Sequence, residues 1–142
     1  MSRTRSRISE NSKWYISAEA TSQMVAFSYR YQEYKDNYES LQNTARAINY
    51  DPQPKGTRIG RPTEEAAIRA SKEKDKIKMI EDAVRETTGD TVLYRFLLRG
   101  VTDSRANVEY LISKGMPYEK TQYYATRREY LWRLSKKFDE RF

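Results

Sequence analysis

The sequence predicts an all-α fold: a long N-terminal helical hairpin followed by a C-terminal trihelical helix-turn-helix unit. Apolar residues recur at alternating steps of four and three along residues 17–48, which is the spacing of one face of a helix. Glycine and proline interrupt the helical patterns at 49–62, 89, 100 and 115–117. No stretch shows the clean alternation of apolar and polar residues that a half-buried strand needs.

Residues 1–16 are expected to form a flexible basic arm, because they hold four basic side chains against one acidic side chain. Ser17 is a suitable N-cap, and Glu19 lies where the helix dipole favours a negative charge. The first helix is expected to run from there to about Asn49. Its narrow apolar seam needs a partner helix. The seam contains Ala20, Met24, Phe27, Tyr31, Tyr34, Tyr38, Leu41, Ala45 and Ile48.

The segment 49–62 is a linker with three prolines and two glycines. Thr63 is expected to cap a second helix that runs to about Thr88 and stops at Gly89. Glu73 interrupts its weaker apolar stripe, which contains Ala66, Ala70, Ile77, Ile80 and Val84. The simplest arrangement packs this helix back on the first as a hairpin, and a dimer could bury the same stripes between chains. Residues 17–88 are therefore predicted to be a hairpin and oligomerisation region.

Residues 89–142 are predicted to form a separate helix-turn-helix domain. Asp90 would cap a third helix that ends at Gly100, and its buried residues would be Val92, Leu93, Phe96 and Leu97. A short fourth helix over roughly 105–114 would bury Val108, Leu111 and Ile112, with Gly115 as a left-handed cap. The fifth helix would run from about Tyr118 to Asp139. Its predicted core is Tyr124, Leu131, Leu134 and Phe138, flanked by Tyr130.

The charge and the missing residue types limit the kinds of function that the sequence allows. The 142 residues carry a formal net charge of +7, which favours a polyanionic partner such as nucleic acid. The absence of cysteine and histidine excludes the usual zinc sites, Ser-His-Asp triads and Cys-His dyads. No carboxylates are spaced for acid/base work, so we expect no enzyme, no metal and no cofactor. The longest apolar run is too short to span a bilayer, so we expect no membrane association.

The stretch "SKGMPYEKTQYYATRREYLWRL", residues 113–134, has the parts of a helix-turn-helix: two helical segments joined at a Gly-Met-Pro turn. In such a unit the N-terminal turns of the second helix expose polar side chains to the major groove. Glutamine can read adenine, arginine and lysine can read guanine, and the others can hold phosphates. The predicted DNA-binding residues are Lys114, Lys120, Gln122, Tyr123, Thr126, Arg127 and Arg128. Two core helices joined by a short turn would give a similar pattern.

Two other basic segments are possible accessory DNA contacts. Arg3, Arg5 and Arg7 in the arm could track phosphates or enter a minor groove, or the arm could be a solvated tail. Arg58 and Arg61 lie in "RIGRPTEE", which shares Gly-Arg-Pro with minor-groove hooks. The alternative for this stretch is a linker that opens the next helix.

At "RAINYD", "GRPTEEAAIRA" and "GMPYEKTQYYATRREYLWRL" the chain resembles the RinA/ArpU-like late-gene regulators of phages and prophages of Gram-positive bacteria. The resemblance covers most of residues 25–137. It implies a sequence-specific double-stranded-DNA-binding regulator of late-gene transcription. We also expect a homodimer in the bacterial cytoplasm, with host RNA polymerase as a further candidate partner. One departure is Tyr118-Glu119, where these relatives have small residues after the proline of the turn.

Two other functions remain open from the sequence. One is a phage DNA-packaging protein such as a small terminase subunit, for which a ring-shaped oligomer would be evidence. The other is a protein-binding module that inhibits or redirects a host machine, in which the tyrosine-rich seam would be the functional surface.

Overall fold

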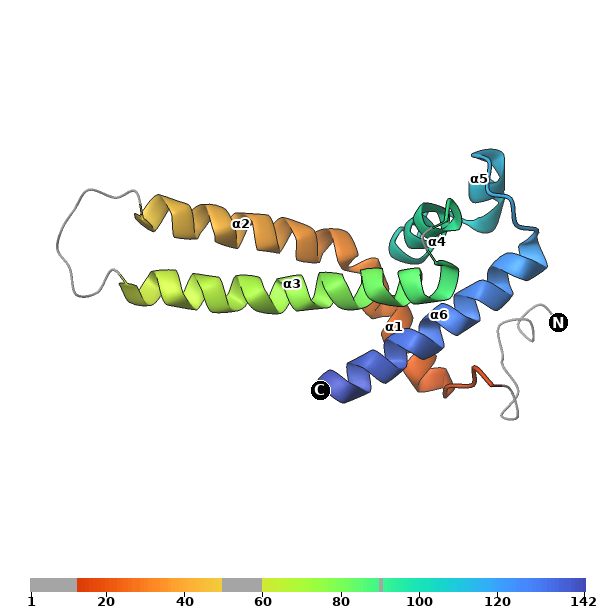
Figure 1. Cartoon of the computed structure of the whole chain (residues 1–142), viewed down its shortest axis with the longest axis horizontal. Coiled ribbons are helices and arrows are strands. Elements are labelled where there is room, and N and C mark those ends of the chain that lie inside the picture. The colour runs from red at the N-terminus through yellow and green to blue at the C-terminus, as the bar shows by residue number, and fades with distance from the viewer. Residues whose placement is uncertain (1–12, 50–59, 90) are drawn as a thin grey trace. The chain divides into compact units, whose positions relative to one another are not determined.

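The computed structural model describes residues 13–49, 60–89 and 91–142, with side chains described for 13–44, 64–89 and 91–142. Within these ranges all regular structure is helical, which confirms the predicted all-α class (Figure 1). The helices are α1 (Ala18–Tyr29), α2 (Tyr31–Asn49), α3 (Gly60–Thr88), α4 (Leu93–Thr102), α5 (Val108–Ser113) and α6 (Lys120–Arg141). None of the described helices is long and apolar enough to cross a bilayer.

The chain divides into two compact units. The described part of the first unit is 13–30, 79–89 and 91–142, so it contains α1, the end of α3 and α4–α6. The second unit is 31–78, with α2 and the beginning of α3. These units divide the chain at residues 30 and 78, whereas the sequence predicted boundaries at residues 16 and 88. The difference arises because α1 packs on α4 and α6.

The helix expected to run unbroken through residues 17–49 is two helices, and this part of the prediction is wrong. The Ser28 hydroxyl donates to the Met24 carbonyl at 2.8 Å, a bond that competes with regular helix geometry. The Arg30 N–H then donates to the Phe27 carbonyl at 3.2 Å and closes a tight turn. At the other end of α1 the predicted cap is confirmed, since Ser17 Oγ accepts from the Ala20 N–H at 3.0 Å.

The core of the first unit is formed by side chains from five helices. α1 contacts α4 and α6, and α4, α5 and α6 contact one another. The rings of Phe27 in α1 and Phe138 in α6 meet edge-on, with centroids 5.6 Å apart. The buried apolar residues of this unit are Met24, Met79, Ile80, Ala83, Val84, Leu97, Val101, Ala106, Val108, Leu111, Met116, Tyr123, Tyr130, Leu131 and Leu134.

In the second unit, α2 and the first part of α3 lie side by side (Figure 1). Glu73 is buried here, and its carboxylate accepts from Asn37 Nδ2 at 3.0 Å and from Lys76 Nζ at 2.8 Å. The Lys76 ammonium also lies 5.0 Å from the ring centre of Tyr34. Glu73 is therefore tolerated in an apolar stripe because its charge is paired and hydrogen-bonded.

The helix boundaries follow the glycines only in part. α3 ends at Thr88, and Gly89 has a positive φ of 71°, as predicted. α3 begins at Gly60, so Thr63 lies inside its first turn and is not the N-cap. Asp90, the predicted cap of the next helix, lies outside the described residues.

Candidate nucleic-acid interface

α4 continues through Gly100, where the sequence predicted its end. A Cβ at Gly100 would collide with the Tyr123 hydroxyl and lie 2.9 Å from Leu111 Cδ1. The glycine is therefore required by close packing of α4 on α5 and α6 and does not terminate the helix. The buried face of α4 also differs from the prediction. Leu97, Gly100 and Val101 are buried, whereas Val92, a predicted core residue, is exposed.

The turn after α5 has the hydrogen bonds of a Schellman motif. The Gly115 N–H donates to the Ile112 carbonyl and the Met116 N–H to the Leu111 carbonyl, both at 3.0 Å. Gly115 has a φ of 102°, which confirms the predicted left-handed cap. Leu111 and Met116 are both buried, so the turn is fixed by packing as well as by hydrogen bonds.

α5 itself is shorter than predicted. Its N-cap is Asn107, whose Oδ1 accepts from the Tyr110 N–H at 2.8 Å. Val108 and Leu111 are buried as predicted, but Ile112 is 43 % exposed and is not a core residue.

α6 begins with a capping arrangement that engages Gln122, one of the predicted DNA-binding residues. Glu119 is the N-cap, and its backbone N–H donates to Gln122 Oε1 at 2.9 Å. The negative charge of Glu119 also lies at the positive end of the helix dipole. Reading adenine would require the same carboxamide oxygen of Gln122 that caps the helix. In this structure the side chain of Gln122 therefore helps to cap α6. Glu119, the acidic residue after the turn, serves as the N-cap of the same helix.

Tyr123 is buried, with only 4 % of its surface exposed, so the expectation that its side chain is exposed on α6 is wrong. Its hydroxyl lies against Gly100. Tyr124, the predicted core residue, is half-buried instead. Over this first part of α6 the buried face is thus one residue out of the predicted register, although Leu131 and Leu134 are buried as predicted.

Burial also predicts how Tyr123 responds to pH. Loss of hydration raises the pKa of Tyr123 to about 12, with the nearby positive charge of Arg127 opposing the shift. An unfolded tyrosine ionises near pH 10. Because the folded pKa is raised, this contribution to stability is fully present below about pH 10. It is lost as the pH rises towards about 12, with a total near 2–3 kcal/mol.

Urea unfolding between about pH 9 and 12 measures this effect, with Tyr123→Phe as the comparison. Tyr123→Phe should lose less stability over this range than the native chain, because it lacks the hydroxyl that ionises. The titration of all other groups is common to both proteins. Parallel pH curves for the two proteins would mean that Tyr123 ionises as an exposed phenol.

The other predicted contact residues on α6 differ in how available they are. Lys120 Nζ pairs with Glu109 Oε2 at 3.0 Å, and the Thr126 hydroxyl donates to the Gln122 carbonyl at 2.8 Å. Arg127 and Arg128 are half-buried and form no ion pair with any residue that the structure describes. Their guanidinium groups are therefore the predicted α6 contacts with the least competition for their charge.

The predicted accessory DNA contacts fall on positions whose side chains the structure does not describe. Arg3, Arg5, Arg7 and Arg58 lie outside the described residues, and so does the side chain of Arg61, in the first turn of α3. What is described is the end of the arm. The Trp14 ring meets the Trp132 ring edge-on with centroids 5.1 Å apart, and the Arg133 guanidinium lies 5.6 Å from the Trp14 ring centre. The arm therefore joins the fold against α6.

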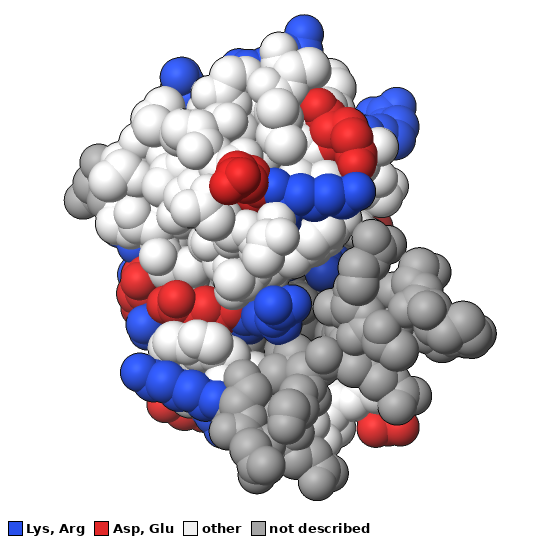
Figure 2. Space-filling model, turned by 90° about the vertical axis from the view of Figure 1, so that its right-hand side faces the viewer, with Lys and Arg blue, Asp and Glu red and all other residues white. Residues whose placement is uncertain are grey.

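The surface charge is mixed. Figure 2 shows a face on which the described basic and acidic side chains are interspersed with uncharged ones. Within the ranges that the structure describes, no group of three or more acidic side chains could hold a metal ion.

Comparisons with known proteins do not assign the chain to a family. No family model matches the sequence, no curated protein matches it, and no solved structure matches it.

Proposed function

We propose that this protein is a sequence-specific double-stranded-DNA-binding regulator of phage or prophage late-gene transcription. The observation that carries the proposal is the mutual packing of α4, α5 and α6 around the Schellman turn at Gly115. This arrangement supports the proposal because it resembles a helix-turn-helix unit, although residues 114–119 make the connection between α5 and α6 longer than the usual turn of three or four residues. The motif resemblance at residues 113–134 supports the same function.

The structure changes which side chains would do the reading. Gln122 caps α6 and Tyr123 is buried, so Arg127 and Arg128 remain as the best candidates for base or phosphate contacts. An arginine can bind guanine with two hydrogen bonds or a phosphate with its planar fork. Lys114 is exposed at the end of α5 and suits a backbone phosphate. Association would begin with electrostatic attraction and end with α6 in the major groove.

The proposal includes a homodimer in the bacterial cytoplasm, with host RNA polymerase as a further partner. Two α6 helices related by a dimer axis would lie about one DNA turn, roughly 34 Å, apart. The mass of the DNA complex separates this from the packaging alternative, because a small terminase subunit would form a larger ring.

Arg127→Ala combined with Arg128→Ala is expected to lower affinity for a selected duplex at least tenfold. Each arginine contact to a base or phosphate contributes on the order of 1–3 kcal/mol. Lys72→Ala with Lys74→Ala, which removes two exposed charges from α3, is the charge-matched control. Fluorescence anisotropy measures affinity, and circular dichroism checks that each variant is folded. Equal affinity of the arginine variant and the control would exclude α6 as the DNA-reading helix.

A further inference from the structure

Two cations, one from α4 and one from the residue after α5, lie close to the ring of Tyr110. The Arg99 guanidinium of α4 lies 5.5 Å from the ring centre of Tyr110 in α5. The Lys114 ammonium, from the residue that follows α5, lies 5.5 Å from the same centre. Arg99 Nη2 also approaches the Tyr110 hydroxyl at 3.4 Å. The ring therefore holds two positive charges close together, since an aromatic face attracts cations.

The carboxylate of Asp103 lies between Arg99 and a third cation, Arg105. Asp103 accepts from Arg99 Nε at 3.3 Å, and Arg105 Nε lies 3.6 Å from its other oxygen. The Arg105 backbone N–H donates to Asp103 at 3.0 Å. This backbone hydrogen bond, together with the two arginines, lowers the pKa of Asp103 and keeps it charged. One negative charge thus orients two guanidinium groups and leaves an excess of positive charge.

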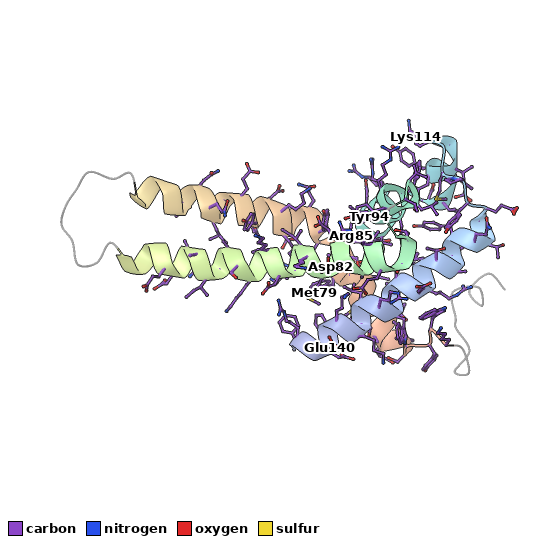
Figure 3. All side chains as sticks on the ribbon, viewed as in Figure 1. Met79, Asp82, Arg85, Tyr94, Lys114 and Glu140 are labelled. Carbon is purple, nitrogen blue, oxygen red and sulfur yellow. The ribbon has the colours of Figure 1, made fainter. Side chains whose placement is uncertain are left out.

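The three basic side chains are open to solvent. The Arg105 side chain is 92 % exposed and the Arg99 side chain 54 %. Lys114, which is labelled in Figure 3, directly follows α5 and is exposed. We call Arg99, Arg105 and Lys114, with Tyr110 and Asp103, the α4–α5 basic cluster. Only Lys114 was singled out from the sequence, because the other residues lie on two helices and the loop between them and show no spacing pattern.

We propose that the α4–α5 basic cluster binds phosphates of the DNA backbone. The inference rests on the proposed DNA-binding function and adds a second contact surface to α6. Arginine forks and a lysine held within one small area match the oxygens of adjacent phosphates, and phosphate contacts fix position without reading sequence. The cluster adjoins the start of α6, because Glu109, the neighbour of Tyr110, pairs with Lys120 at 3.0 Å.

Arg105→Ala with Lys114→Ala tests the cluster, again with Lys72→Ala and Lys74→Ala as the charge-matched control. Each phosphate contact contributes about 0.9 to the slope of log affinity against log salt. The cluster variant should therefore lower that slope by roughly two, and it should weaken selected and unrelated duplexes by the same factor. The control should keep the native slope.

The outcomes separate the two proposals. If the native chain binds duplex DNA and the cluster variant matches the control, the cluster proposal is overturned and the proposed function stands. The same holds if the cluster variant weakens only the selected duplex, since that would be base reading. If the native chain binds no duplex but captures an acidic peptide through these residues, both proposals fail.

Two substitutions of Tyr110 test whether its ring positions the cations, because neither substitution changes the charge of the cluster. Tyr110→Phe keeps the aromatic face and should leave DNA affinity within about twofold. Tyr110→Leu keeps every charge but removes the face that positions Arg99 and Lys114, so affinity should fall several-fold at low salt. Both variants should fold, because Tyr110 is half-buried at the surface. Equal affinity of the two variants would show that the ring does not position the cations.

Discussion

Replacing Gly100 with alanine is expected to lower the free energy of unfolding by about 3 kcal/mol. The new methyl group would meet the Tyr123 hydroxyl and Leu111 Cδ1 in a packed interface, which forces the helices apart. Urea unfolding followed by tryptophan fluorescence measures this change in the first unit, because both tryptophans of the chain, Trp14 and Trp132, lie in it.

The sign of the change in unfolding free energy shows whether Gly100 is packed against α6 or lies on an open helix face. On an open helix face, alanine would stabilise the chain by up to about 1 kcal/mol through its higher helix propensity. Tyr123→Phe removes the hydroxyl that the methyl group would strike first, so the Gly100→Ala and Tyr123→Phe double variant should lose less than the sum of the single losses. A stabilising Gly100→Ala, or strictly additive losses, would contradict the packing of α4 on α6.

Tyr130→Ala should cost about 3–5 kcal/mol of unfolding free energy. Tyr130 is fully buried, and truncation of a large buried ring leaves a cavity as well as losing apolar contacts. Its hydroxyl lies 2.7 Å from Ser28 Oγ, in a buried hydrogen bond between α6 and α1. Because the Ser28 hydrogen is donated to the Met24 carbonyl, Tyr130 must be the donor in this bond.

Smaller substitutions separate the hydrogen bond from the cavity. Tyr130→Phe and Ser28→Ala should each cost on the order of 1–3 kcal/mol, and the double variant should cost less than their sum because the two groups share one bond. The same fluorescence-detected unfolding measures all three. Additive losses would mean that α1 does not dock on α6 through this pair.

Local features of the fold could be predicted from the sequence, because they depend on neighbouring residues. Ser17 caps α1, Gly89 follows the end of α3, and Gly115 takes a left-handed conformation, all as predicted. Each depends on a residue type with a specific backbone preference or a side chain that reaches its own helix end.

The failures come from packing between segments far apart in the sequence. The apolar seam from Met24 to Tyr34 is continuous in sequence, but its two ends are buried in different units. Gly100 was interpreted as a helix end because nothing local shows that a tyrosine hydroxyl needs its space. Periodicity alone does not determine which of two adjacent tyrosines, Tyr123 or Tyr124, faces the core.

The candidate site shows the same division. The basic residues of α6 were visible in the sequence as a group, but the capping role of Gln122 and the burial of Tyr123 were not. The α4–α5 basic cluster was missed because Arg99 and Tyr110 come together only through the packing of α4 on α5. What the structure adds is therefore a different assignment of roles within the segment that the sequence had singled out.

Selection of duplexes from a random DNA library by the full chain, followed by a salt titration of the best binder, tests the central claim most directly. The account predicts a defined sequence, steep loss of affinity with rising salt, and weaker binding after Arg127→Ala with Arg128→Ala. A folded chain that binds no duplex at about 50 mM salt would contradict it.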